Sequence, residues 1–290
     1  KRHLVFAPTG SASPDYYGGL RPSADPWANS VVALDARTGR LDWGYQLVHH
    51  DLWAYDTASA PVLADVPVGG RLVPAVIAGN KTGFLYVLDR KTGKPLYPVE
   101  ERPVPQSATP GEETSPTQPI PAFLPALTRQ SVAPDDLFGS NDEERAACRK
   151  TLDELGVGAV FTPPSVKGII AVPGNAGGLN WSGFGYDPVR KLVIAPATIL
   201  PFVVRLVPAA NFHSESEHGD LRAELTEQIG AGFAISRKPF MSPGRVPCVK
   251  PPWGELVALD LTSGKIRWRT PLGSVRDLSP SAPDAPTGSP

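Results

Sequence analysis

Residues 43–56 hold the densest group of potentially reactive side chains in the sequence. Eight consecutive positions supply two histidines, two aspartates and two aromatic residues, namely His49, His50, Asp51, Trp53, Tyr55 and Asp56. The segment begins like a strand and turns polar where a strand would end, which is typical of a loop that holds a ligand on a rigid scaffold. It therefore predicts a site of chemistry and not a simple connection.

The geometry of an extended segment decides which of these side chains can act together. Adjacent histidines could suggest a pair of metal ligands, but neighbouring side chains in a strand point to opposite faces. We therefore expect His49 and His50 to orient the loop by hydrogen bonds. In the same geometry Asp56 would share one face with residue 54, and Asp51 would point to the other face.

A turn motif recurs along the chain and indicates the elements that would position this loop. An apolar stretch is followed by an Asp, two residues, a Thr or Ser, a Gly and a basic residue. The complete copies start at Asp35, Asp89 and Asp260, and a fourth at Asp187 lacks the Gly. Each copy predicts a β-hairpin in which the Asp caps the turn and the Gly takes a positive φ.

The spacing of these hairpins predicts an all-β fold. The four aspartates lie 54, 98 and 73 residues apart, which suits a β-propeller of four-stranded blades with insertions between them. A β-sandwich with similar turns is the alternative. An aromatic residue stands eight positions after the Asp of each complete copy, and we assign Trp43 and Trp268 at this position to packing.

Composition agrees with many short strands. The 290 residues include 34 prolines and 28 glycines, which break helices, and also six tryptophans and ten phenylalanines, which argue against disorder. A net charge of −1 gives no electrostatic footprint for nucleic acid, so we exclude nucleic-acid binding. The sequence contains no apolar run of about 18 residues, so it predicts no membrane-spanning helix. The first residues resemble a strand and not a signal peptide, so we expect the chain to start in mid-domain.

The whole of residues 1–290 is expected to form one partial propeller domain with two irregular insertions. The first insertion covers about residues 98–165 and is rich in Pro, Thr and Ser. Within it, Ser140 and Glu143 match a capping box for a helix that runs to about Leu155 and ends at Gly156.

The second insertion covers about residues 208–250. It predicts a helix over residues 221–229, and a solvated loop over residues 213–218, whose composition resembles a metal cluster without the spacing of one. The cysteines, Cys148 and Cys248, lie in different insertions, so a disulfide would hold the two together. Two separate buried thiols are the alternative.

An ordered series of segments resembles the pyrroloquinoline quinone (PQQ) dependent alcohol and sugar dehydrogenases, and more narrowly their membrane-bound glucose/quinate dehydrogenase branch. These segments are residues 43–56, Asn80-Lys-Thr-Gly83, Leu88-Asp-Arg90, Thr117-Gln-Pro119, Phe161-Thr-Pro-Pro164, Pro173-Gly-Asn175, Asn180-Trp-Ser-Gly183, Leu200-Pro-Phe-Val203, Pro247-Cys248 and Trp253-Gly254. The resemblance implies an eight-bladed propeller, of which this chain would form about half, with PQQ and calcium near its axis. It also implies a periplasmic location, ubiquinone as electron acceptor, and membrane association through a segment outside this chain.

The resemblance also implies roles for particular residues. Lys81 matches the lysine that hydrogen-bonds the quinone oxygens, and Asn180 and Trp181 match a pair that lines the cofactor chamber. Without the resemblance, Lys81 would be an exposed turn lysine, Asn180 a hairpin residue and Trp181 a packing residue. Both cysteines stand where this branch carries cysteines, which is consistent with the periplasm.

One position departs from the family pattern. The family's general base is the Asp that directly follows the Trp of this loop, and here that position is Ala54. A methyl group neither takes a proton nor binds a metal. Asp56 is the best substitute as base and metal ligand, and Asp51 is the second candidate base. The sequence thus predicts either a dehydrogenase for a sugar, polyol or cyclic alcohol, or a non-catalytic propeller that serves as a binding scaffold.

Overall fold

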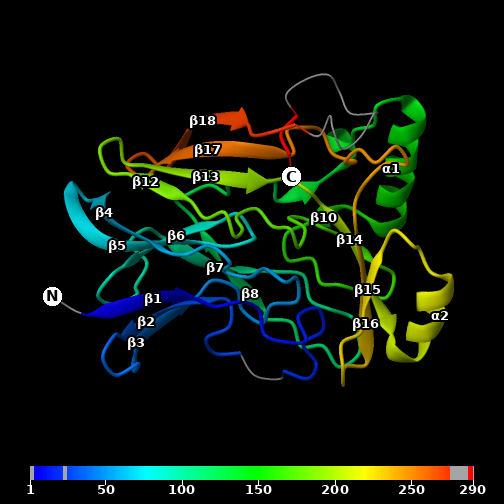
Figure 1. Ribbon diagram of the computed structural model, residues 1–290, viewed down its shortest axis with the longest axis horizontal. Helices are drawn as coiled ribbons and strands as arrows, with labels where there is room; N and C mark the ends of the chain where they lie inside the picture. Colours follow the sequence, from blue (N-terminus) through cyan, green and yellow to red (C-terminus); the bar gives the residue numbers. More distant parts are fainter. Residues whose placement is uncertain (1–2, 22–24, 275–286, 290) are drawn as a thin grey trace.

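The computed structural model describes residues 3–21, 25–274 and 287–289, which fold mainly into short antiparallel strands (Figure 1). The first strands are β1 (Leu4–Pro8), β2 (Ser30–Asp35), β3 (Leu41–Gln46), β4 (Val62–Val68), β5 (Arg71–Gly79), β6 (Leu85–Asp89), β7 (Val99–Pro103) and β8 (Thr117–Pro121). They are followed by β9 (Ser131–Val132), β10 (Gly158–Ala159), β11 (Ile169–Ala171), β12 (Gly185–Asp187), β13 (Leu192–Thr198), β14 (Phe202–Pro208), β15 (Glu224–Thr226), β16 (Phe233–Pro239), β17 (Gly254–Asp260) and β18 (Lys265–Pro271).

Three sheets follow one another in space in the order of the sequence. They are β1-β2-β3, then β4-β5-β6, then the four-stranded sheet β12-β13-β17-β18. Figure 1 shows them from the bottom to the top of its left half. A further four-stranded sheet, β11-β14-β16-β15, stands beside the helices on the right. Successive small sheets around a common centre are the arrangement of propeller blades, and not that of a two-layer sandwich.

The predicted hairpin turns form as expected. The Oδ1 atom of Asp35 accepts the N–H groups of Arg37 and Thr38 at 3.0 and 2.9 Å, and Asp89 and Asp260 cap their turns in the same way. The glycines four positions after these aspartates, Gly39, Gly93 and Gly264, have φ values of 70°, 71° and 68°. This is the left-handed region, which only glycine enters without steric cost.

The aromatic residue of one repeat packs on the turn of the next repeat. The indole of Trp43 donates to the carbonyl of Arg90 at 3.4 Å, and a Cβ added to Gly93 would lie 2.5 Å from the Trp43 ring. In the next repeat the hydroxyl of Tyr97 donates to the carbonyl of Leu261 at 2.7 Å. These contacts join neighbouring sheets and confirm a packing role for Trp43. Trp268 remains 40% exposed.

The fourth copy of the turn joins β12 to β13, the first pair of strands in its sheet, whereas the Asp260 copy joins the last pair. Asp187 accepts the N–H groups of Val189 and Arg190 at 2.8 and 2.9 Å. The position four residues after Asp187 is Lys191, with a φ of 59°. A lysine therefore occupies the strained place that glycine takes in the other copies.

Replacing this lysine should stabilise the protein. We expect Lys191→Gly to raise the free energy of unfolding by about 1 kcal/mol, because a left-handed backbone costs a residue with a Cβ roughly that much. Lys191→Ala is the matched control and should give no such gain, since alanine keeps the Cβ. Chemical denaturation of the two variants measures the difference. Equal stability of both would show that the strain at residue 191 is negligible.

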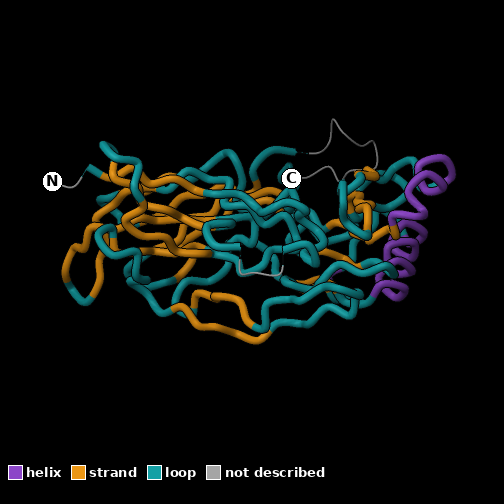
Figure 2. Tube along the Cα trace, turned by 90° about the horizontal axis from the view of Figure 1, so that it is seen from below, coloured by secondary structure: helices purple, strands orange, loops and turns teal. Residues whose placement is uncertain are grey.

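The helices lie together at one end of the molecule (Figure 2). Helix α1 (Asp142–Leu155) confirms the helix predicted in the first insertion, but its cap lies one residue later than expected. The side chain of Asn141, not that of Ser140, accepts the N–H of Glu144 at 2.9 Å, and the Glu144 carboxylate accepts the N–H of Ser140 at 3.0 Å. In the described parts of the chain no helix is long and apolar enough to cross a membrane.

The secondary structure expected for the second insertion is wrong at two places. Helix α2 (Phe212–His218) forms where the solvated loop was expected. Two short 3₁₀ turns, η1 (Pro134–Asp136) and η2 (Ala209–Asn211), come earlier in the chain. The helix expected over residues 221–229 is absent, and strand β15 pairs there with β16.

Tertiary contacts explain why strand β15 forms. Arg237 on β16 holds the Glu224 carboxylate with two hydrogen bonds, of 2.9 and 2.6 Å. The two apolar ends of the expected helix, Leu221 and Ile229, are 94% and 88% exposed, so neither adds buried apolar surface here. Pairing with β16 therefore overrides local helix propensity.

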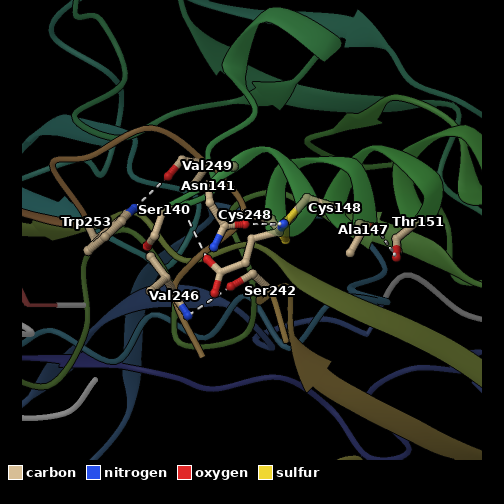
Figure 3. Close-up of a disulfide and its surroundings, with 11 residues drawn as sticks. Ser140, Asn141, Ala147, Cys148, Thr151, Ser242, Val246, Cys248, Val249 and Trp253 are labelled. Atoms are coloured by element: carbon tan, nitrogen blue, oxygen red, sulfur yellow. Dashed lines mark hydrogen bonds between the residues drawn. A yellow bond between two sulfur atoms is a disulfide. The ribbon is translucent and has the colours of Figure 1, made fainter. Parts of the chain in front are cut away.

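The cysteines form a disulfide, as expected. Cys148 on α1 and Cys248 lie 5.5 Å apart between Cα atoms and join segments 100 residues apart (Figure 3). Both are 1% exposed and belong to an apolar cluster that includes Trp253, whose indole donates to the carbonyl of Val249 at 2.7 Å. The bridge fixes α1 against the segment that follows β16.

Removing this bridge should destabilise the protein strongly. We expect a combined Cys148→Ser and Cys248→Ser variant to lose about 3–5 kcal/mol of unfolding free energy, because closing a long loop removes entropy from the unfolded chain. Chemical denaturation with and without a reducing agent measures it. The reducing agent should lower the stability of the natural protein and leave that of the double variant unchanged. A loss below about 1 kcal/mol would contradict a stabilising role.

Candidate functional site

The polar loop between β3 and β4 is folded around the buried carboxylate of Asp51, which is 1% exposed. Its Oδ1 atom accepts the N–H of Trp53 at 2.9 Å, and Oδ2 accepts the N–H of Tyr55 at 2.8 Å. The amide of Asn29 also donates to Oδ2, at 2.9 Å, and so does the hydroxyl of Ser11. Asp51 therefore holds together the loop and the segments before β2.

This enclosure changes the geometry expected for the loop. His50 and Ala54 have φ values of 42° and 56°, so the loop is a series of turns, and the extended conformation expected for residues 51–56 is wrong. The cause is the Asp51 carboxylate, which draws the N–H groups of the following residues toward itself. Burial raises the pKa of Asp51, although its four hydrogen bonds favour the charged form. A catalytic role for Asp51 stays a prediction, while its contacts are those of a loop organiser.

Asp56 and Lys81 form the charged centre of the site. The Lys81 ammonium donates to Oδ2 of Asp56 at 2.6 Å, and the N–H of Ser11 donates to Oδ1 at 2.7 Å. Burial alone would raise the pKa of Asp56, but the hydrogen bonds from Lys81 and Ser11 together hold it below its ordinary value. Asp56 is therefore an anion that is already committed to a cation, which makes it a weak base.

Glycines let the chain close around the Lys81 stem. Lys81 is only 9% exposed and lies in the turn after β5. Gly177 has a φ of 80°, and a Cβ there would lie 2.4 Å from the Cγ of Lys81. The N–H of Gly178 donates to the carbonyl of Lys81 at 2.6 Å. These contacts place the segment around residue 177 beside the Lys81–Asp56 pair.

Asn180 and Trp181 end the same segment. The amide of Asn180 donates to the carbonyl of Ala176 at 2.7 Å, and its oxygen accepts the N–H of Trp181 at 2.9 Å. The hydroxyl of Ser59 donates to the Asn180 carbonyl, which ties the segment to the polar loop. The Trp181 side chain is 85% exposed. The structure thus brings the segment of Asn180 and Trp181 next to Lys81, while their contact with a cofactor stays a prediction.

Ala54 lies beside the Asp56–Lys81 pair in the chain but faces an apolar cluster. It is 5% exposed and packs with Tyr16 and Tyr17, together with residues of β11 and β14. Its left-handed backbone is a conformation that Asp and Asn adopt more readily than Ala. The backbone at this position would therefore accept an aspartate more easily than the alanine that is present.

The two histidines orient the loop, as expected. His49 contacts Gln46 at 2.8 Å and Glu101 at 3.2 Å. His50 is buried between two carboxylates, with Glu112 at 3.0 Å from Nε2 and Asp25 at 3.4 Å from Nδ1. The rings diverge to different partners and do not form a metal-binding pair.

Several functional candidates were not assigned a role from sequence. Buried polar atoms without a hydrogen-bond partner among the described residues flank the charged centre, namely Thr57 Oγ1, Asn80 Nδ2 and Asn175 Oδ1. Such atoms are rare in folded proteins and point to a ligand or water at the site. Asn175 stands in one of the resembling segments, which was the available signal. The closeness of Ser11 to the polar loop could have been found from the strand order. Strands β1 and β3 run in the same direction, so both end on the same side of their sheet.

No group of three or more His, Cys, Asp or Glu side chains within the described ranges is arranged to hold a metal ion. Asp56 could offer one oxygen, yet both of its oxygens already have donors. The described residues by themselves therefore do not make a calcium site.

The whole chain, residues 1–290, matches the family model described as the glucose/ethanol/alcohol dehydrogenase β-propeller domain that binds PQQ. The chain therefore belongs to this family of quinoprotein dehydrogenases. This finding confirms both the predicted family and the predicted all-β propeller fold.

Relatives of known sequence agree. The chain is 38% identical to the quinoprotein glucose dehydrogenase of Escherichia coli over 97% of its length, and 36% identical to a probable quinate dehydrogenase of Xanthomonas campestris over 96%. It is 37% identical to the glycerol dehydrogenase large subunit of Gluconobacter thailandicus over 99%. The chain spans about a third of the first relatives, 36% of the Escherichia coli protein, for instance.

Solved structures support the fold alone. The quinohemoprotein alcohol dehydrogenase of Comamonas testosteroni aligns with a TM-score of 0.55 and 23% identity. The alignment covers 92% of this chain and 33% of that one.

The residues around Lys81 fit the PQQ that this family binds. PQQ is an anionic quinone, and the site offers as donors the Lys81 ammonium and the amide of Asn80, whose Nδ2 has no partner among the described residues. Lys81, Asn80 and Asn175 are the residues that would hold it. The calcium part of the expected site does not fit the described residues alone.

Proposed function

We propose that the protein containing this chain is a PQQ-dependent dehydrogenase that oxidises a sugar, polyol or cyclic alcohol. The relatives named for glucose, quinate and glycerol support this range of substrates. The observation that carries the proposal is the Lys81 ammonium, 2.6 Å from Asp56 and flanked by buried polar atoms without partners. A loop that only connects two strands does not need a buried ammonium among polar atoms without partners.

The bound cofactor supplies an electrophilic quinone that accepts the hydride of an alcohol. This chain's own residues position and charge that site. The Lys81 ammonium stabilises negative charge on a quinone oxygen, and the Asp56 carboxylate fixes the direction of the ammonium. Because Gly177 has no side chain, the backbone can approach the stem of Lys81. Gly178 likewise lets the backbone pass close to Gly83. Asn180 and Trp181 are proposed as the wall of the chamber.

We further propose calcium as a second cofactor, ubiquinone as the electron acceptor, and the periplasm as the location. The relative in Xanthomonas campestris is named for a quinone, which supports that acceptor. The Cys148–Cys248 disulfide supports an oxidising compartment. Asp56 is the one proposed calcium ligand of this chain, and it would have to give up the donor from Lys81 or from Ser11 to bind the metal. The further ligands and the membrane-associated segment are proposed to lie outside residues 1–290.

The second candidate function is a propeller that binds a ligand without catalysis. Ala54 favours it, because the methyl group at the family's base position cannot take a proton. Asp56 is held by Lys81, and Asp51 is enclosed by backbone donors, so neither carboxylate is an evident replacement.

Restoring the family's aspartate separates the two functions. We expect Ala54→Asp in the full-length protein, supplied with PQQ and calcium, to raise kcat on a sugar or polyol by about 10²–10⁴-fold, the usual contribution of a general base. Ala54→Asn is the matched control and should give no gain, since it has the shape of Asp without the basicity. If Ala54→Asp binds PQQ yet oxidises no sugar, polyol or cyclic alcohol, the scaffold function is correct.

A further inference from the structure

Strands β7 and β8 pair only with each other among the described residues, and we call this hairpin, residues 99–121, the arm. The tip of the arm is closed by its own hydrogen bonds. The N–H of Val104 donates to the carbonyl of Pro116 at 3.2 Å, and the N–H of Ser107 donates to the hydroxyl of Thr114 at 3.0 Å. The tip was expected only as part of an irregular insertion, whereas the structure makes it an ordered body that can hold what it contacts.

The arm holds the main chain of the polar loop through Gln118 on β8, which is fully buried. The Oε1 atom of Gln118 accepts the N–H of His49 at 2.8 Å, and its Nε2 atom donates to the carbonyl of the same residue at 2.6 Å. On the other strand of the arm, the Glu101 carboxylate lies 3.2 Å from the His49 ring. Both strands of the arm therefore fix the start of the polar loop.

The tip of the arm holds the next residue of the loop through the carboxylate of Glu112. Its Oε1 atom lies 3.0 Å from Nε2 of His50, and its Oε2 atom accepts the N–H of Gly18 at 2.6 Å. The side chains of Glu112 and His50 are only 3% and 7% exposed. A Cβ added to Gly18 would lie 2.1 Å from Nε2 of His50, so the ring has little room to move. The hydroxyl of Tyr17 donates to the carbonyl of Pro110 at 3.0 Å and docks the tip on the same segment.

The backbone of His50 requires such a hold, because its φ is 42°. A residue with a Cβ keeps this left-handed conformation only where its surroundings enforce it. His50 stands directly before Asp51, whose carboxylate orders the N–H groups of the residues that lead to Asp56. A change of the backbone at residue 50 would therefore shift the carboxylate that faces Lys81.

We propose that Glu112 is a positioning residue, which the arm carries to the polar loop to keep Asp56 in the place where it faces Lys81 and where PQQ binds. Gln118 sets where the loop starts, and Glu112 sets the direction in which it turns at His50. Glu112 thus acts on the Asp56–Lys81 pair through another residue. The part of this inference that concerns PQQ rests on the proposed function.

The first measurement needs no cofactor. In the full-length protein, we expect Glu112→Gln to speed up deuterium exchange of the Trp53 and Tyr55 N–H groups at least about tenfold, the equivalent of one lost hydrogen bond to a charged group. Mass spectrometry of the peptide that carries residues 51–56 measures it. Glu113→Gln is the matched control, because Glu113 is the next residue of the arm and is exposed, and it should exchange like the natural protein. Equal exchange in the two variants overturns the inference.

The second measurement is the affinity for PQQ. Glu112→Gln should weaken PQQ binding about 2- to 30-fold, the usual range for a residue that acts on a ligand through other residues, and Glu113→Gln should leave it unchanged. The same substitution is then made in a His50→Asn background, in which asparagine still accepts the left-handed backbone. There Glu112→Gln should change the affinity by less than about twofold, because the link through the ring is already removed.

The outcomes separate the positioning role from other causes. An undiminished effect of Glu112→Gln in the His50→Asn background would show that Glu112 acts through Gly18 or through general stability, and it overturns the inference. Natural PQQ affinity of Glu112→Gln overturns the part that concerns PQQ. If the natural protein binds no PQQ, the proposed function fails, and the exchange measurement still decides whether Glu112 positions the loop.

Discussion

Replacing Lys81 by methionine is expected to lower PQQ-dependent turnover of the full-length protein by about 10²–10³-fold. A donor aimed at a developing oxyanion in a water-poor site typically contributes that much. The side chain is 9% exposed and its ammonium lies 2.6 Å from Asp56, so methionine keeps the packing of the stem and removes only the charge. Reconstitution with PQQ, followed by steady-state kinetics, measures the loss.

A matched lysine controls for a general effect of charge. Lys94 lies in the hairpin turn after Asp89 and is exposed, so Lys94→Met should leave turnover and PQQ affinity unchanged. Natural activity of Lys81→Met would mean that the ammonium serves only to neutralise Asp56. If the natural protein shows no basal turnover, the same pair is compared in the Ala54→Asp background.

Asp51→Ala is expected to lower the unfolding free energy by about 3–5 kcal/mol. The change would leave the N–H groups of Trp53 and Tyr55 and the amide of Asn29 buried without an acceptor, and each orphaned group costs about 1–3 kcal/mol. Loss of a buried, fully bonded carboxylate belongs to the short list of mechanisms with such large effects. Chemical denaturation measures the change.

Two variants sharpen this measurement. Asp51→Asn keeps the size of the side chain and one of its two acceptor oxygens, so it should cost less than Asp51→Ala. Glu217→Ala removes an exposed carboxylate and should change stability by less than about 0.5 kcal/mol. If Asp51→Ala unfolds at the same denaturant concentration as Glu217→Ala, the loop does not depend on the buried carboxylate.

The regular hairpins could be predicted from sequence because their physics is local. Asp35 and Gly39 meet within one turn, and the same is true of each complete copy, so the motif alone specifies the geometry. The copy at Asp187 was also recognisable without its glycine. In the structure, Lys191 adopts the left-handed conformation in the place of that glycine. The placement of one cysteine in each insertion favoured the disulfide, with two separate thiols as the alternative.

The features that sequence could not predict depend on distant contacts. Strand β15 forms because Arg237 holds Glu224 from another strand, a pairing that no local pattern of residues 221–229 reveals. The shape of the polar loop depends on Asn29 and Ser11, which lie 22 and 40 positions before Asp51. Lys81 was placed by its resemblance to the family, and its distance to Asp56 needed the fold.

The most direct test of the central claim is a crystal structure of the full-length protein grown with PQQ. We expect PQQ beside residues 80–83 and 175–181, with a quinone oxygen within hydrogen-bonding distance of the Lys81 ammonium and with Asp56 still on the opposite side of that ammonium. PQQ bound away from Lys81, or a Lys81 ammonium that faces Asp56 alone while PQQ occupies another part of the propeller, would contradict it.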